Sequence, residues 1–254
     1  MNDAQVVANT TPPEERPPSV WQLLVDVIVR PGHAFAQITR WQGARWVFPA
    51  IIVLLSVVVL IVVQAPFAAE EARRQLQTQL GTLPPDQAQA MMEQTARFTT
   101  PVFIMITGGL AAIVIQVLTW LLISAILYFA VLIGGGEATF GMAWSVTPWT
   151  ALPFALRNLI QAAWEYTHQE VMRYPGLSSL VATGNMDADR MNPLYALLAQ
   201  IDPLTLWHGF LIYWALHKGL NVPARGAFVL TLVYGAIMLS LGMIPALIAG
   251  AFAG

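Results

Sequence analysis

The sequence predicts an all-α fold, namely an integral membrane bundle of five transmembrane helices. Hydrophobic residues make up 57% of the 254 residues and charged residues only 10%, whereas soluble domains carry roughly 25% charged residues. Because so few charged residues cannot cover the surface of a protein in water, most of the chain is expected to lie in lipid. A helix needs about 20 apolar residues to cross a bilayer. The runs without charge are residues 46–69, 98–136, 138–156, 203–217 and 226–254.

The N-terminal region is expected to lie outside the bilayer. Residues 1–19 are polar and proline-rich, and they lack the basic start and apolar core of a signal peptide. This composition predicts a disordered tail. Residues 20–45 are apolar with scattered charges, which predicts an amphipathic interfacial segment on the inner surface, interrupted at Pro31 and Gly32.

The membrane domain is predicted to cover residues 46–254. Its first span is the clearest, because Trp46 stands where an indole favours the interface and Pro49 falls in the first turn. The second run is too long for one span and too short for two, so a tilted or protruding helix is expected. Asp202 and Pro203 are typical of an N-cap and first helical position, and they start the fourth span. The predicted spans are residues 46–66, 103–133, 142–163, 203–222 and 226–250.

Two longer connections are expected outside the membrane. Residues 68–100 are polar and predict two short helices broken at Pro84 and Pro85, whereas residues 164–202 mix acids with aromatic and aliphatic side chains and predict an interfacial loop. Five spans place the two termini on opposite sides. Basic residues before the first span and in the fourth connection predict a cytoplasmic N-terminus by the positive-inside rule.

The stretch GGGEATFG, beginning at Gly134, raises the question of a phosphate-binding loop. A dinucleotide fingerprint needs G-x-G-x-x-G after a strand, but here Thr139 stands where the third glycine belongs and a membrane helix precedes. The lysine of a P-loop is missing as well. We therefore interpret Gly135 and Gly136 as a helix C-cap and tight turn between the second and third spans.

The third predicted span contains Pro148 and Pro153. Each proline removes one helical hydrogen bond, to the carbonyls of Trp144 and Trp149 respectively. In lipid such carbonyls need other partners. Two interpretations stay open: a kinked helix that only packs, or a broken helix that lines a polar cavity, as in transporters.

Arg157 lies near the end of the same span. Its simplest interpretation is snorkelling toward the interface. The alternative is a functional contact with an anion or an ion pair, because intramembrane charges are often functional. Glu165 and Asp202 are the candidate partners.

The sequence does not contain a recognisable catalytic or metal-binding pattern. It has no cysteine, and its four histidines show no H-E-x-x-H arrangement. The G-x-S-x-G elbow of common serine hydrolases is missing too. No catalytic residue, cofactor, metal or nucleic-acid partner is therefore expected.

Three blocks of the sequence are familiar in their order and spacing. The chain resembles the Yip1 family of small multi-span membrane proteins, in its prokaryotic branch, over about residues 28–245. The blocks are RPGHAFAQI with RWVFPAI, then GGGEATFGMAWSVTPWTALP, then IDPLTLWHGFLIYWALHKGLNV. Positions that carry the resemblance are Pro31, Phe35, Ile38, Trp46, Pro49, Gly135, Gly136, Phe140, Ala143, Pro153, Asp202, Leu204, Trp207 and Gly219.

The resemblance implies a five-helix membrane domain with a cytosolic N-terminus. Eukaryotic members are associated with Rab-type GTPases and early secretory traffic, but the DLYGP motif of that branch is missing here. The family has no established catalytic set. For a bacterial source, the resemblance implies the inner membrane.

The expected function is that of a non-enzymatic membrane protein in membrane organisation or in protein and lipid interaction. Its expected partners are the lipid bilayer and a membrane protein or a second copy of the chain. The alternative is a small transporter or channel subunit that uses the proline-bent third span, for which Pro148, Pro153 and Arg157 are the candidate residues.

Overall fold

The computed structural model describes residues 16–41, 43–81, 83–134 and 136–252, and every regular element within these ranges is helical. Most of the tail predicted at residues 1–19 therefore lies outside the described residues. The α-helices are α1 (Val20–Val29), α2 (Pro31–Arg40), α3 (Val47–Leu80), α4 (Pro85–Thr95), α5 (Pro101–Ile133), α6 (Phe140–Thr150), α7 (Leu152–His168), α8 (Met186–Met191), α9 (Pro193–Ala199), α10 (Pro203–Trp214) and α11 (Ala224–Phe252). Four short turns of helix complete the fold: η1 (Ala44–Trp46), η2 (Ala96–Thr99), η3 (Ser178–Leu180) and the π-helical turn η4 (Ala215–Gly219).

Three helical segments of the described chain are long and apolar enough to cross a membrane, namely Ala44–Leu80, Pro101–Ile133 and Ala224–Ala251. They correspond to the first, second and fifth predicted spans. The other two predicted spans are each built from two pieces. Residues 142–163 are divided between α6 and α7, and residues 203–222 contain α10 followed by η4.

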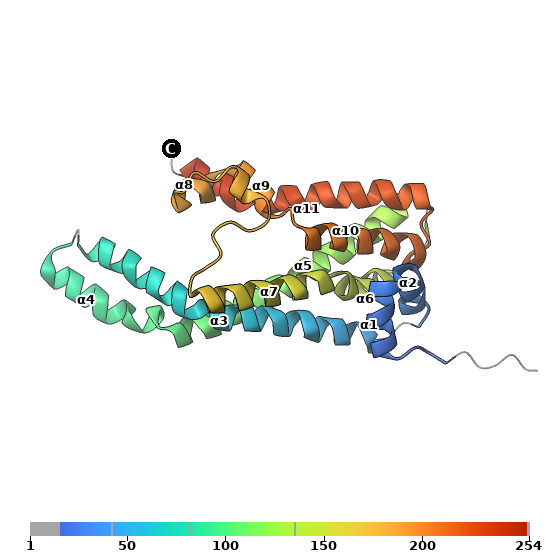
Figure 1. Cartoon of the computed structure of the whole chain (residues 1–254), viewed down its shortest axis with the longest axis horizontal. Coiled ribbons are helices and arrows are strands. Elements are labelled where there is room, and N and C mark those ends of the chain that lie inside the picture. The colour runs from blue at the N-terminus through green and yellow to red at the C-terminus, as the bar shows by residue number, and fades with distance from the viewer. Residues whose placement is uncertain (1–15, 42, 82, 135, 253–254) are drawn as a thin grey trace, which may run out of the picture.

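The long helices lie side by side along the long axis of the molecule (Figure 1). One layer contains α3 and α7, and the other contains α10 and α11, with α5 behind them (Figure 1). The layers meet where α7 packs against α10. At one end, α1 and α2 cross the bundle beside the two short connections; we call this the α1–α2 end. The opposite end carries α4, α8 and α9, and we call it the α4–α9 end (Figure 1).

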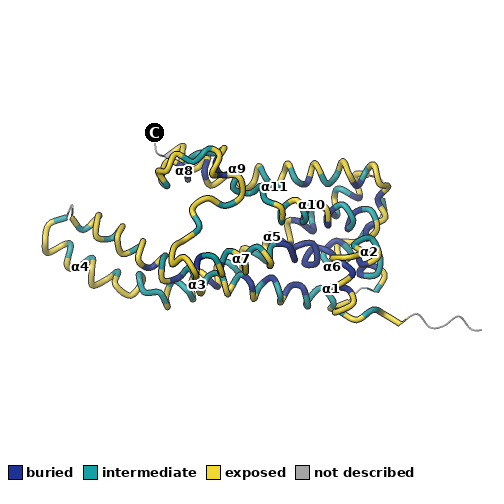
Figure 2. The backbone as a smooth tube through the Cα atoms, in the orientation of Figure 1, coloured by how far each residue is buried: buried dark blue, intermediate teal, exposed yellow. Residues whose placement is uncertain are grey.

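The main core lies at the α1–α2 end, where buried residues concentrate (Figure 2). There the apolar face of α2, with Phe35 and Ile38, packs against η4. A Cβ on Gly219 would lie 3.4 Å from the Phe35 Cβ, so the two backbones approach closely. Trp149 of α6 completes the same cluster. Segments from all three sequence blocks therefore meet in one core.

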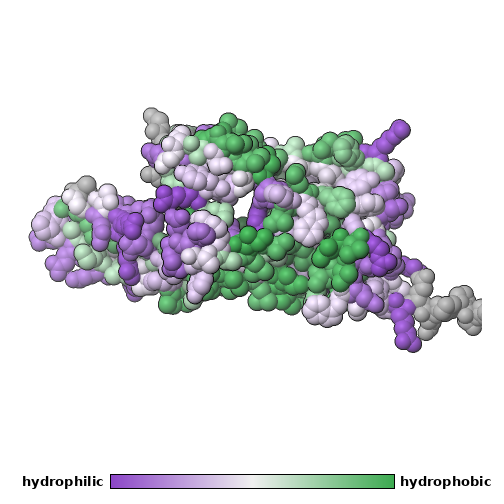
Figure 3. Space-filling model, viewed as in Figure 1, coloured by the Kyte–Doolittle hydropathy of each residue, from purple (hydrophilic) through white to green (hydrophobic). Residues whose placement is uncertain are grey.

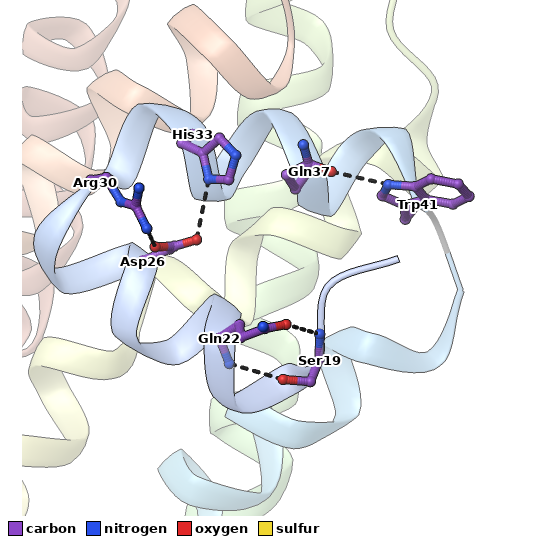
Figure 4. A network of polar contacts seen from close by, with 7 residues as sticks. All are labelled: Ser19, Gln22, Asp26, Arg30, His33, Gln37 and Trp41. Atoms are coloured by element: carbon purple, nitrogen blue, oxygen red, sulfur yellow. Dashed lines mark hydrogen bonds and ion pairs between the residues drawn. The ribbon is translucent and has the colours of Figure 1, made fainter. Parts of the chain in front are cut away.

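The corner between α1 and α2 is held by polar contacts (Figure 4). The buried Asp26 carboxylate accepts from Arg30 Nη2 at 2.9 Å and lies 3.1 Å from His33 Nδ1. At the start of α1, the Ser19 hydroxyl accepts from Gln22 N at 3.2 Å, while the Gln22 side chain accepts from Ser19 N at 2.8 Å. This capping box fixes the entry into the short helix.

The first long helix runs further than its predicted span. Residues 46–66 were expected to cross the membrane and a separate polar helix to follow, but α3 continues without a break to Leu80. The residues after Pro66 are mostly Ala, Glu, Arg, Gln and Leu, which are strong helix formers, so nothing in them ends the helix. The second expected polar helix is α4, which begins at Pro85.

The surface divides by hydropathy along the same axis. Apolar side chains cover the middle of the molecule, while hydrophilic ones gather over α4 and at the α1–α2 end (Figure 3). Many large apolar side chains on α5 and α11 are exposed, among them Leu110, Leu118, Phe228 and Leu232. Such a belt is the expected surface of a protein that lies in lipid.

Candidate functional site

A cavity of about 830 Å³ lies between α3, α5, α7, α10 and α11. Figure 3 shows the molecule hollowed between the layer of α3 and α7 and the layer that contains α11. Small-molecule sites in proteins commonly measure about 300–1,000 Å³ and combine apolar walls with a few placed polar groups. Here Val57, Ile123, Leu232 and Leu239 belong to the walls, with polar side chains between them.

Arg157 lines this cavity and is anchored on one side. Its Nη1 lies 3.3 Å from Asp202 Oδ2, and its guanidinium carbon lies 4.7 Å above the centre of the Phe154 ring. Of the two partners that the sequence offered, the structure pairs Arg157 with Asp202. The Asp202 Oδ1 accepts from Leu204 N at 2.8 Å and from Thr205 N at 2.7 Å, which confirms the predicted N-cap of α10.

Glu165, the other candidate partner, is buried in a separate cluster of amide groups. Its Oε1 accepts from Gln64 Nε2 at 3.1 Å, from Gln161 Nε2 at 2.9 Å and from Met172 N at 3.1 Å. These bonds tie α3 to α7 and to the loop that follows. The second oxygen, Oε2, is buried and has no hydrogen-bond partner among the described residues.

The proline-rich segment breaks into two helices at Ala151. Pro153 occupies the first turn of α7, and Phe154 N donates to Ala151 O at 2.9 Å instead of to Thr150 O. The Thr150 carbonyl is thereby left out of the helical ladder. His208 of α10 lies with Nδ1 2.6 Å from that carbonyl oxygen. A carbonyl freed by the break is thus bonded to a neighbouring helix, as lipid requires.

The break also frees a carbonyl beyond the two expected from the prolines, which were those of Trp144 and Trp149. Ala151 N donates to Pro148 O at 3.3 Å. The carbonyl that bonds to α10, through His208, is that of Thr150. Around Ala151 the backbone N–H groups bond to carbonyls three residues earlier, as in a 3₁₀-helix, and this leaves the Thr150 carbonyl without a backbone donor.

The α6 part of the segment is packed rather than open. Pro148 and its neighbours from Ser145 to Thr150 are buried. The Thr147 hydroxyl donates to Ala143 O at 2.9 Å and lies 2.9 Å from the Ser124 hydroxyl of α5. Cavity-lining residues begin at Ala151 and continue along α7. The half before Ala151 thus packs inside the bundle, and the half after it lines a cavity whose walls are mostly apolar.

His208 lines the cavity and joins α6, α10 and α11. A carbonyl only accepts, so Nδ1 carries the proton donated to Thr150, and the neutral ring accepts at Nε2 from the Tyr234 hydroxyl at 2.7 Å. The ring also lies 4.6 Å from the centre of Phe154. Because both nitrogens are engaged, His208 does not have a free nitrogen for a metal. No group of three potential metal ligands occurs within the described residues.

Further polar side chains line the cavity from α5 and α7. Gln116 lies at the middle of α5, and its amide makes no hydrogen bond to any other described residue. Asn158 Nδ2 donates to Ser56 Oγ of α3 at 3.2 Å. The buried indole N–H of Trp120 has no partner among the described residues. An amide in the middle of a membrane helix is costly unless something accepts its hydrogen bonds.

The predicted glycine turn lies away from the cavity, at the α1–α2 end (Figure 1). Gly136 N donates to Val131 O at 2.9 Å, which is the hydrogen bond of a Schellman C-cap. Thr139 then caps α6 by accepting from Met142 N at 3.2 Å. Gly135 lies outside the described residues.

Of the six residues singled out from the sequence, Arg157 and Asp202 form an ion pair at the cavity, and Pro153 lies in the first turn of α7. Pro148 is buried in α6, and Gly136 belongs to the turn. Sequence reasoning missed Gln116, Asn158 and Tyr234, and it weighed His208 only as a metal ligand. The available signal was a polar side chain inside a run without charge, since such a group needs a partner in lipid.

Comparison with known proteins gives a family and nothing finer. No curated protein and no solved structure matches the chain. The family model of the Yip1 domain matches residues 25–244 of the 254, a stretch that includes α2, both halves of the bent segment and the whole cavity. The chain is therefore a membrane-spanning member of the Yip1 domain family.

Proposed function

We propose that this chain is a non-enzymatic, five-span membrane protein that acts in membrane organisation by binding a lipid or a protein partner within the bilayer. The carrying observation is the cavity, whose walls are mostly apolar and whose polar groups converge from α5, α7, α10 and α11. This combination is typical of a binding site. His208 and Tyr234, the groups best suited to acid–base chemistry there, are engaged with each other and with the backbone.

The course of the chain supports the five-span arrangement. The α6–α7 segment runs from the α1–α2 end to the α4–α9 end, and α10 with η4 runs from the middle of the molecule back to the α1–α2 end (Figure 1). The α6–α7 segment is about as long as one of the long helices, whereas α10 with η4 covers a shorter stretch than α11. We place the N-terminus in the cytoplasm, because Arg30, Arg40, Arg45, Lys218 and Arg225 gather at the α1–α2 end. The chain belongs, in this proposal, to the prokaryotic branch and to a bacterial inner membrane.

In the same arrangement α1 lies in the plane of the membrane surface, across the bundle axis (Figure 1). Its outward face carries Trp21, Val25 and Ile28, all exposed, at the spacing of one helical face. An apolar stripe of this kind, with an indole at its start, suits the boundary between headgroups and acyl chains.

Site-specific photocrosslinking in native membranes tests the proposed function. A photoreactive residue in place of Leu206, which lines the cavity and is exposed, should capture a small and reproducible set of lipid or protein neighbours. The matched position is Met92 in the polar α4, where no such set is expected. The proposal fails when Leu206 yields no reproducible neighbour while the purified protein turns over a substrate.

A small transporter or channel subunit is the second candidate. The broken third span and the cavity beside Arg157 favour it, since transporters place binding sites at interrupted helices. Flux into proteoliposomes that depends on this path should disappear when Pro148, Pro153 and Arg157 are replaced together. Flux that survives the triple replacement would remove the reason for this candidate.

A further inference from the structure

The cavity communicates with the lipid-facing surface. Leu206 and Leu232 both line it, yet they are 68% and 58% exposed. These residues come from α10 and α11, and α11 makes few contacts with α5, which borders the cavity from the other side. An alkyl chain in the surrounding bilayer can therefore enter sideways without leaving an apolar environment.

The described lining of the cavity carries positive charge only. Among the described residues that line it, Arg157 alone is charged. Its side chain is 39% exposed, and among the described residues it donates one hydrogen bond, from Nη1 to Asp202 Oδ2, so the other N–H groups of the guanidinium can bond to a ligand. A guanidinium has five N–H donors.

The Asp202 carboxylate does not cancel this charge alone. Its Oδ1 accepts two backbone N–H groups at the start of α10, and a helix N-terminus itself carries partial positive charge. The carboxylate is thus shared between the helix and Arg157. The local balance favours an anion close to the guanidinium, with neutral donors such as Gln116 further along the cavity.

We propose that the cavity binds an acidic amphiphile, with one or more alkyl chains along its apolar walls and a phosphate or carboxylate head at Arg157. The inference rests on the proposed function and names the ligand class of the same site. The apolar walls select a lipid over a soluble anion, while Arg157 selects an acidic head over a zwitterionic one. Recognition of the acidic head is assigned to Arg157, because no other described residue of the lining is charged.

The test uses the full chain in phosphatidylcholine nanodiscs that contain a trace of diazirine-labelled phosphatidic acid. Diazirine-labelled phosphatidylcholine serves as the zwitterionic probe, and a diazirine-labelled fatty acid tests whether a carboxylate head suffices. Mass spectrometry locates the adducts after illumination. We expect phosphatidic acid to label segments around the cavity in preference to phosphatidylcholine, with a difference of about tenfold for a charge-assisted hydrogen bond.

Two pairs of variants separate the site from general lipid contact. Gly235 lines the cavity and a Cβ there meets nothing within 4 Å, so Gly235→Leu fills the cavity without a local clash; Gly108 on α5 is equally open but outside the lining, so Gly108→Leu is its control. Arg157→Gln removes the charge and Arg157→Lys keeps it. Arg74→Gln, on the exposed part of α3, controls for the loss of an arginine.

The proposal expects Gly235→Leu to suppress cavity labelling and Gly108→Leu to leave it unchanged. Arg157→Gln should abolish the preference for the acidic lipid, whereas Arg157→Lys and Arg74→Gln should retain it. If Gly235→Leu leaves the labelling unchanged, the labelled lipid lies on the protein surface and the proposal is overturned. Competition by inorganic phosphate alone would also overturn it, because the site would then take a soluble anion. Either failure leaves the crosslinking result at Leu206 intact, so the proposed function is judged separately.

Discussion

At the scale of single residues, the membrane domain depends on polar groups that bond across helices. Thr150, His208 and Tyr234 form one chain of hydrogen bonds from α6 through α10 to α11. Arg157 and Asp202 form a second link between α7 and α10. Between helices in lipid, hydrogen bonds contribute only about 0.6 kcal/mol on average, but a group left unpaired costs more.

A double-mutant cycle measures the first of these links. Tyr234→Phe should lower stability by about 1 kcal/mol, because it leaves His208 Nε2 without its donor. His208→Leu should cost more, since it strands both the Thr150 carbonyl and the Tyr234 hydroxyl. The combined variant should cost less than the sum of the two changes. Thermal inactivation followed by size-exclusion chromatography in detergent gives the values, and strict additivity would show that the two groups do not interact.

Gly176 shows how a loop residue positions the site. Its φ is +58°, and a Cβ would lie 2.8 Å from the carbonyl oxygens of Leu198, Ala199 and Ile201, just before Asp202. Gly176→Ala should destabilise the protein by roughly 2–5 kcal/mol, because backbone oxygens cannot move aside as a side chain can. Gly184 has φ +84° and open space around it, so Gly184→Ala should cost only about 1–2 kcal/mol. Equal losses in the two variants would contradict the packing argument.

At the scale of elements, the break between α6 and α7 is the feature that couples packing to the cavity. The half before Ala151 is buried in the bundle and the half after it lines the cavity. In a continuous helix the Thr150 carbonyl would accept the backbone N–H of Phe154 and would not be available to His208 of α10. The break and the position of His208 are therefore parts of one arrangement.

Replacing Pro153 tests this coupling. Pro153→Ala restores the N–H that proline lacks and allows Phe154 N to bond with Thr150 O in a regular helix. We expect His208→Leu to cost less in the Pro153→Ala background than in the native chain, because the Thr150 carbonyl then has another partner. The same thermal assay applies, and an unchanged cost for His208→Leu would contradict the role assigned to the break.

The elements also show what the sequence predicts well. Runs without charge predicted α3, α5 and α11, because hydropathy alone decides where a long helix meets lipid. Asp202 and Pro203 marked the start of α10 correctly, since capping is a local property. The extension of α3 to Leu80 was missed, because helix propensity continues where hydropathy ends.

The site was less predictable than the helices. Arg157 and Asp202 were singled out individually, and Asp202 was one of two possible partners, but only the fold brings residues 45 positions apart within 3.3 Å. The bonds from His208 to α6 and α11 depend in the same way on how three helices pack. A polar side chain in an apolar run signals that a partner exists, but its identity is a property of the tertiary structure.

At the scale of the whole molecule, the account requires five crossings, two of them made by interrupted helices. The chain contains no cysteine, so single cysteines can report the side of each connection to a membrane-impermeant maleimide. Asp86, Glu137 and Glu170 lie in the first three connections, and Arg225 lies in the first turn of α11, directly after the fourth; all four are exposed. Their replacement by cysteine leaves the described ion pairs untouched.

The most direct measurement is maleimide labelling of these four variants in intact and opened membrane vesicles of known orientation. Five spans predict that cysteines at 86 and 170 react on one side, and that those at 137 and 225 react on the other, cytoplasmic side. Cysteines at 137 and 170 that react from the same side would contradict the account, because α6 and α7 would then enter and leave the membrane at one face and not form a span.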